Sequence, residues 1–170
     1  MKSDLPIPFS YQVTENFFAG EYPFEKVREE GLTKLQKLID FGIKFFIDLT
    51  EERQFLTEYR EFLPPDCTYL NLPTEDNTSP DFQDLKTAHD IISQSDGKVY
   101  VHCKGGYDRT GVVVATYFIY LGKTSDEAKE LYLQKADKIR KRYPHKPLIE
   151  TKWKILELYR EWLAQANTSS

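Results

Sequence analysis

The sequence predicts an α/β fold: a single domain with a short, mostly parallel central sheet flanked by helices. Short apolar runs, typical of buried strands, alternate along the chain with stretches whose apolar residues recur at helical spacing. The 170 residues are enough to bury one hydrophobic core, and no internal repeat or linker divides them. We expect the domain over residues 11–165, with an N-terminal tail at 1–10 and a C-terminal tail at 166–170.

The strands are predicted where short apolar runs end at turn-forming residues. The run 43–50, IKFFIDLT, is nearly continuous in apolar residues, as expected of a strand buried on both faces. The other strands are expected at 12–20, 67–73 and 98–103. Because helical stretches separate most of these runs, the strands should pair mainly in parallel.

The helices are predicted from apolar periodicity between glycine or proline stops. Gly42 ends the first, Pro64 follows the second, and Pro144 with Pro147 separates the last two. The expected helical ranges are 31–42, 51–63, 81–94, 110–122, 125–143 and 147–164. Residues 74–80, TEDNTSP, form a polar loop between a strand and a helix.

Composition and charge exclude several classes of protein. A net charge of -4 and a pI near 5.5 argue against nucleic-acid binding, which needs a basic face. The first ten residues lack the apolar core of a signal peptide, and no stretch has the roughly 20 apolar residues of a membrane helix. Two cysteines make neither a disulfide scaffold nor a zinc site. We therefore expect a cytoplasmic protein, a monomer, without metal or cofactor.

One loop carries more chemistry than a connection needs. Residues 102–111 read HCKGGYDRTG and lie between the strand at 98–103 and the helix that begins near Thr110. In a parallel sheet this junction is the carboxyl edge, where ligands bind. The helix directs the positive end of its dipole, about half a unit charge, at the loop. The loop is therefore placed to bind an anion.

The residue types in this loop suit phosphate. Gly105 and Gly106 permit positive φ angles, so that successive N–H groups can surround an anion. Arg109 can grip two oxygens of a tetrahedral oxyanion. The amides, the helix dipole and Arg109 all favour the thiolate of Cys103. We expect Cys103 to act as the nucleophile and Arg109 to bind the phosphate.

The remaining loop residues have supporting roles in this interpretation. Thr110 can donate a hydroxyl hydrogen bond to the sulfur when it leaves phosphorus, and His102 orients the loop from behind. Lys104 adds a cation beside the pocket. Tyr107 and Asp108 complete the loop around the substrate, and Asp108 is the residue with the least obvious purpose.

The loop, as His102 to Gly111, resembles the H-C-x-x-G-x-x-R-T-G signature of cysteine-dependent protein tyrosine phosphatases. The stretches ENFFAGEYP and FIDLTEE and the size of the chain resemble the small atypical dual-specificity branch. The resemblance implies hydrolysis of phosphomonoesters through a cysteinyl-phosphate, without metal. The substrate would be a phosphorylated protein or a small phosphorylated molecule.

The family mechanism also requires a carboxylic acid in a preceding loop, to protonate the leaving oxygen and then activate water. Asp76, in the loop 74–80, is our choice. Glu75 and Asp81 are alternatives, although Asp81 suits a helix N-cap better. Asp108 is a rival, since the loop aspartate has the acid role in myotubularin-type phosphatases, which the Asp-Arg-Thr ending resembles.

Two other functions remain open at this point. An inositol-phosphate or phosphoinositide phosphatase would use the same mechanism, and Lys104 resembles cations of such enzymes. A phosphate-binding module without catalysis is less favoured, because such relatives usually lack the cysteine or the arginine, and Cys103 and Arg109 are both present. Release of phosphate from phosphopeptides, inositol phosphates and lipids would separate these functions.

Other residues that could carry chemistry have plainer interpretations. Cys67 begins its strand, so it should lie at the sheet edge opposite Cys103 and serve packing rather than a protective disulfide. His89 and His145 are expected to be structural or solvated. The basic stretch 135–146 is expected to be a solvated helix face, with attraction of an acidic substrate as the alternative. The last helix, with its tryptophans, should pack on the core.

Overall fold

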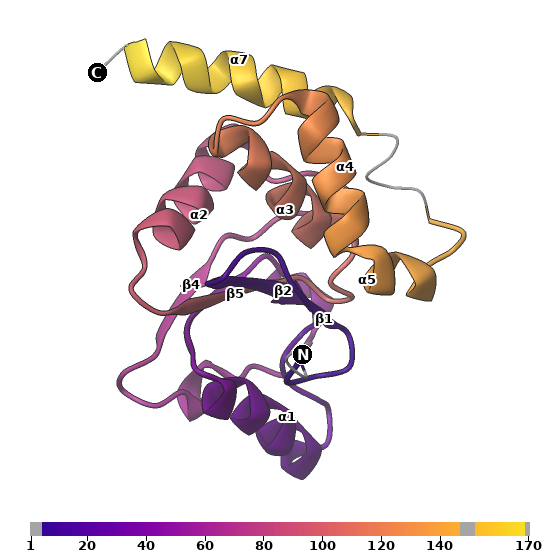
Figure 1. The fold of residues 1–170 in the computed structure, drawn as a ribbon. Coiled ribbons are helices and arrows are strands. Elements are labelled where there is room, and N and C mark those ends of the chain that lie inside the picture. The colour runs from indigo at the N-terminus through magenta and orange to yellow at the C-terminus, as the bar shows by residue number, and fades with distance from the viewer. Residues whose placement is uncertain (1–4, 147–151, 169–170) are drawn as a thin grey trace.

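The computed structural model describes residues 5–146 and 152–168, and it confirms the predicted α/β fold (Figure 1). A five-stranded sheet has the order β1-β2-β5-β3-β4. The strands are β1 Ser10–Gln12, β2 Phe17–Gly20, β3 Ile43–Asp48, β4 Thr68–Asn71 and β5 Lys98–His102. The helices are α1 Arg28–Phe41, α2 Phe82–Gln94, α3 Asp108–Tyr120, α4 Ser125–Lys135, α5 Asp137–Arg142 and α7 Lys154–Thr168, with 3-10 turns η1 Glu52–Gln54 and η2 Arg60–Phe62.

The sheet brings four carboxyl ends together at one edge. Strands β2, β5, β3 and β4 are parallel, and only β1 is antiparallel to its neighbour. In the register of the sheet, His102 at the end of β5 lies beside Gly20 of β2 and beside Asp48 of β3. Asn71 at the end of β4 lies next to Asp48. The loop after β5 therefore leaves the middle of this edge.

Helices cover both faces of the sheet. In Figure 1, α1 lies on one face, and α2, α3, α4 and α7 lie on the other. The central strand β5 supplies both cores, since Val99 and Val101 pack with α2 and α3 while Tyr100 packs toward α1. Helix α3 is buried along almost its whole length. The residues at its N-terminus are thus fixed by the main core of the domain.

Two predicted elements differ from the structure near the N-terminus. Of the expected strand 12–20, Gln12 ends the antiparallel strand β1 and only Phe17–Gly20 forms β2; between them is a turn in which the Val13 and Thr14 N–H groups donate to the carbonyl oxygen of Phe17. Packing also extends beyond the expected domain limits, because Ile7 is buried and α7 continues to Thr168. The limits 11 and 165 stay predictions.

The expected helix 51–63 is wrong. The segment forms only the two short 3-10 turns η1 and η2, and Phe55 between them has a φ of +53°. That left-handed conformation ends a right-handed helix after one turn. Tyr59 and Gln54 instead bond to distant residues, His102 and Arg109. Tertiary contacts have overridden a helical pattern of moderate strength.

The other helices agree with the sequence prediction apart from their ends. The expected helix 125–143 is divided at Ala136 into α4 and α5. The expected last helix, 147–164, begins outside the described residues and is seen from Lys154 onward. Throughout the described parts of the chain, every helix is too short or too polar to cross a lipid bilayer.

Candidate active site

The loop after β5 is pressed against the end of β2. The Tyr22 N–H donates to the carbonyl oxygen of Lys104, at 3.0 Å. Gly106 has a φ of +76°, and a Cβ there would lie 2.3 Å from the carbonyl carbon of Gly20. Only glycine fits at this position. Gly105 does not use a positive φ; its lack of a side chain makes room for the hydroxyl of Tyr143, which would lie 2.5 Å from an added Cβ.

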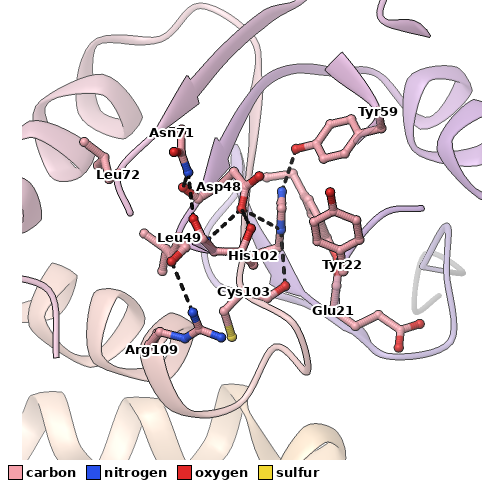
Figure 2. A network of polar contacts seen from close by, with 12 residues as sticks. Glu21, Tyr22, Asp48, Leu49, Tyr59, Asn71, Leu72, His102, Cys103 and Arg109 are labelled. Atoms are coloured by element: carbon pink, nitrogen blue, oxygen red, sulfur yellow. Dashed lines mark hydrogen bonds and ion pairs between the residues drawn. The ribbon is translucent and has the colours of Figure 1, made fainter. Parts of the chain in front are cut away.

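Cys103 and Arg109 line one pocket at the carboxyl edge of the sheet. Figure 2 shows the sulfur of Cys103 next to the guanidinium of Arg109, and both side chains are almost completely buried. The pocket has a volume of about 360 Å³. Its lining residues are Glu21, Asp76, Asn77, Cys103, Lys104, Gly105, Tyr107, Asp108, Arg109, Arg142, Tyr143 and Lys146. The fold thus brings most of the residues predicted from the loop, and Asp76 from another loop, into one space.

The guanidinium of Arg109 is fixed along one side. Its Nη1 donates to the carbonyl oxygens of Leu49, at 3.3 Å, and Thr74, at 3.0 Å, and to Oε1 of Gln54, at 2.8 Å. Its Nε is buried and has no hydrogen-bond partner within residues 5–146 and 152–168. Its Nε therefore remains available for an oxyanion, and Nη2 on the same side of the guanidinium faces only the Asp76 carboxylate among the described residues, at 3.6 Å.

Asp76 reaches the same guanidinium from the loop after β4. Its Oδ1 lies 3.6 Å from Nη2 of Arg109 and accepts a hydrogen bond from the Asn77 N–H, at 3.0 Å. The side chain is 58% exposed, so water can reach it. The alternatives are occupied elsewhere: Glu75 pairs with Arg53, and Asp81 caps α2 by accepting from the Asp84 N–H.

His102 supports the loop from behind, within the core. Its Nδ1 faces the carbonyl oxygen of Cys103 at 3.3 Å, so Nδ1 carries the proton and donates. Its Nε2 then accepts from the Tyr59 hydroxyl at 2.6 Å. Burial lowers the pKa of His102, which keeps the ring neutral, and the Asp48 carboxylate 3.8 Å away opposes this shift. These contacts fix the backbone carbonyl group of Cys103, the residue that carries the sulfur.

Asp108 is held by the segment that leads into α7. Its Oδ1 pairs with Nζ of Lys152 at 3.0 Å, while Oδ2 is buried without a hydrogen-bond partner in the described chain. Thr110 is fully buried, and its hydroxyl likewise has no hydrogen-bond partner among residues 5–146 and 152–168. The expected bond from Thr110 to the sulfur therefore stays a prediction.

One wall of the pocket was not predicted from the sequence. Arg142, Tyr143 and Lys146 line it, and they belong to the basic stretch 135–146 that was expected mainly to be solvated. Arg142 also pairs with Glu21 at 2.8 Å, and the Tyr107 hydroxyl donates to the carbonyl oxygen of Lys146. The only sequence signal was the density of cations, which does not reveal which face a helix end presents.

The remaining residues lie where the plainer interpretations placed them. Cys67 contacts the carbonyl oxygen of Ile43 at the opposite edge of the sheet, and Cys67 and Cys103 are both free thiols. His89 is buried between α2, α3 and α7, with bonds to Tyr159 and Val113. His145 is exposed. Groups of side chains suited to hold a metal ion are absent from the described residues.

Comparison with known proteins agrees with this geometry. Residues 26–154 match the family PTP-SAK, described as the Swiss Army Knife protein, DSP-PTPase phosphatase domain. The chain belongs to this family. The resemblance predicted from the loop is therefore confirmed at the level of the family, and the match covers strands β3, β4 and β5, the loop after β5 and the pocket residues apart from Glu21.

One relative in sequence carries a name of the same class, and solved structures share the fold. The chain is 28% identical over 162 residues to protein 067L of Invertebrate iridescent virus 3, which carries the name of a tyrosine phosphatase; the match covers 90% of this chain but only 59% of the viral protein. The structure of PTPMT1 superposes with a TM-score of 0.71 at 21% identity, over 95% of this chain and all of the other. A mutant of Tk-PTP superposes at 0.69 with 18% identity, over 93% and 98% of the two chains.

Proposed function

We propose that this domain hydrolyses phosphate monoesters through a cysteinyl-phosphate intermediate, as a tyrosine or dual-specificity phosphatase. One observation carries the proposal: the buried sulfur of Cys103 shares a pocket with the guanidinium of Arg109, whose Nε has no hydrogen-bond partner in the described chain and whose Nη2 faces Asp76. A phosphoryl group bound by that guanidinium and by the loop amides would have the thiolate beneath it, placed for attack. The substrate is a phosphorylated protein or a small phosphorylated molecule.

The chemistry has two balanced steps. The Cys103 thiolate attacks phosphorus, the bond from phosphorus to the leaving oxygen breaks, and protonated Asp76 gives that oxygen its proton. The Asp76 carboxylate then takes a proton from a water that attacks the cysteinyl-phosphate. The sulfur–phosphorus bond breaks, inorganic phosphate leaves, and the thiolate returns with Thr110 as its hydrogen-bond donor. Arg109 neutralises the phosphoryl oxygens in both steps.

The experiment is hydrolysis of an aryl phosphate by the wild type and by Cys103→Ser. We expect the wild type to release phosphate, and the serine variant to bind the substrate without turning it over, because the hydroxyl is a far weaker nucleophile than a thiolate. Trapping of the phosphorylated enzyme by rapid acid quench, followed by mass spectrometry, would identify the intermediate. Near-normal turnover by Cys103→Ser would refute the proposal.

A second candidate substrate class is favoured by the basic wall of the pocket. Lys104 and Lys146 line the same space as Arg109, and Arg142 there is paired with Glu21, so the two lysines would attract a substrate with a further anionic group beside the scissile phosphate. PTPMT1, a relative in fold at 19% identity, has been solved in complex with PI(5)P. An inositol phosphate or a phosphoinositide is the corresponding substrate here.

A substrate panel distinguishes the two classes. Phosphotyrosine and phosphothreonine peptides, soluble inositol phosphates and phosphoinositides in vesicles are compared by phosphate release. A kcat/KM for inositol phosphates or phosphoinositides at least tenfold above that for the peptides would establish the second class, and the opposite order would establish the first. The cytoplasmic setting and the monomeric state belong to the same proposal. The cytoplasmic setting rests on the two free cysteines, and the monomeric state rests on the sequence.

A further inference from the structure

Asp108 is the residue of the phosphate-binding loop whose purpose the proposed reaction does not explain. It is the first residue of α3 and directly precedes Arg109. Its side chain lines the same pocket as Cys103 and Arg109, where the phosphoryl group would bind. A carboxylate in this position repels a phosphate dianion. It also takes up part of the positive charge of the helix N-terminus, which the phosphate would otherwise use.

The charge of Asp108 has little contact with solvent. Its side chain is 10% exposed, and Oδ2 is buried without a hydrogen-bond partner in the described chain. Charges in such surroundings are screened less by water and salt than charges at the surface. An uncompensated carboxylate at this position would therefore weaken the binding of phosphate.

Lys152 compensates this charge from outside the pocket. Its Nζ lies 3.0 Å from Oδ1 of Asp108, and its side chain is only 21% exposed, so the pair is more than a solvated surface contact. The other two carboxylates of the pocket lining face arginines that line the pocket themselves. These pairs are Glu21 with Arg142, at 2.8 Å, and Asp76 with Arg109, at 3.6 Å. Lys152 thus adds a positive charge that the described pocket lining does not supply.

We propose that Lys152 is a positioning residue for phosphate binding: it holds the carboxylate of Asp108 and cancels its charge, so that the loop and the N-terminus of α3 can accept a dianion. The inference rests on the proposed function for its catalytic meaning, and on geometry for oxyanion binding. It predicts that loss of Lys152 weakens oxyanion binding, whereas loss of the Asp108 charge strengthens it. A purely structural anchor predicts losses of similar size, because both substitutions break the same ion pair.

The test uses Lys152→Met, Asp108→Asn and the double variant. Methionine keeps much of the length of the lysine side chain without its charge, and asparagine keeps the shape of aspartate. Lys154→Met is the matched control, because Lys154 is exposed at the start of α7 and its loss changes the net charge of the protein by the same amount. For each protein, the Kd of tungstate, a dianionic phosphate mimic, is measured by calorimetry together with the melting temperature. Hydrolysis of an aryl phosphate is measured for the wild type.

We expect Lys152→Met to weaken tungstate binding by about 10-fold, because it leaves the carboxylate of Asp108 uncompensated in the pocket. Asp108→Asn should instead tighten binding by about threefold or more, since the cation of Lys152 then lacks an opposing charge. In the double variant both charges are gone, so the Kd should return to within about threefold of the wild type. Lys154→Met should stay within about twofold of the wild type, because an exposed charge is screened.

Similar losses of tungstate binding in Lys152→Met and Asp108→Asn would overturn the inference. A folded Lys152→Met protein with a Kd close to that of the wild type, or an equal loss in Lys154→Met, would overturn it as well. If Lys152→Met does not fold, Asp108→Asn decides: tighter binding supports the inference, and unchanged or weaker binding overturns it.

The proposed function can fail separately from this inference. Tungstate binding by a wild type that hydrolyses no aryl phosphate would remove the proposed function, yet the order of the Kd values would still decide the role of Lys152. A wild type that fails to bind tungstate would overturn both.

Discussion

Asp76 and Asp108 both line the pocket, but they are held in different ways. Asp108 is buried, and one of its oxygens is committed to Lys152. Asp76 is half exposed on a loop, and its carboxylate faces the open side of Arg109. The second catalytic step needs a carboxylate that a water molecule can reach. The exposure of Asp76 favours it as the acid and leaves Asp108 the role of anchoring the segment before α7.

We therefore predict opposite behaviour for Asp76→Ala and Asp108→Ala. Asp76→Ala should lose roughly 10²-fold or more in kcat on phenyl phosphate, whose leaving group needs a proton, and much less on p-nitrophenyl phosphate. Asp108→Ala should leave the ratio of kcat on phenyl phosphate to kcat on p-nitrophenyl phosphate the same as in the wild type. The check is kcat on both esters. A ratio that changes in Asp108→Ala and not in Asp76→Ala would transfer the acid role to Asp108.

At the scale of elements, α7 links the C-terminal part of the chain to the core beneath the site. The Tyr159 hydroxyl donates to Nδ1 of His89 on α2, at 2.7 Å, and Nε2 of His89 donates to the carbonyl oxygen of Val113 on α3, at 3.0 Å. Leu156 and Tyr159 are buried against the same core. The His89 ring is thus a polar connection among three helices.

Tyr159→Phe should destabilise the domain without changing its activity. The substitution leaves a buried ring nitrogen without its donor, which costs about 1–3 kcal/mol in the free energy of unfolding. Urea unfolding measures this loss, and kcat/KM on an aryl phosphate should stay within about twofold because the pocket is untouched. Leu158→Ala on the exposed side of the same helix is the matched control, with a loss of about 0.5 kcal/mol or less.

At the scale of the whole molecule, two buried neutral histidines make folding sensitive to acid. Burial lowers the pKa of His89 to about 3 and also lowers the pKa of His102, from an ordinary value of 6.5. Between pH 6.5 and the lowered pKa of each ring, the unfolded chain binds more protons than the folded one. The stability associated with both rings is therefore complete above pH 6.5 and declines as the pH falls below it.

The predicted result is a free energy of unfolding that falls between pH 6.5 and 4.5. His89 contributes a slope of up to about 1.4 kcal/mol per pH unit over this range, and His102 adds to the slope in the same direction. Urea unfolding at several pH values gives the slope. In His89→Gln the slope should fall by up to about 1.4 kcal/mol per pH unit, whatever the absolute stability of the variant. A pH-independent free energy in the wild type over this range would contradict the prediction.

The segment 51–63 shows why part of this site could not be predicted. Its apolar spacing suggested a helix, yet Phe55 takes a left-handed conformation and Gln54 and Tyr59 bond to Arg109 and His102. Those partners lie more than 40 residues away in the chain. Local periodicity contains no information about such contacts, so neither the loss of the helix nor the hydrogen bond between Gln54 and Arg109 could be predicted.

The sequence by itself determined the α/β fold, the family and the anion-binding loop, because glycine spacing, a strand-to-helix junction and the pair Cys103 and Arg109 are local properties. Tertiary structure alone decided the hydrogen bonds that hold Nη1 of Arg109, the ion pair of Asp108 with Lys152, and the basic wall of Arg142 and Lys146. These depend on how distant segments meet at the carboxyl edge of the sheet, and packing of the whole chain sets that geometry.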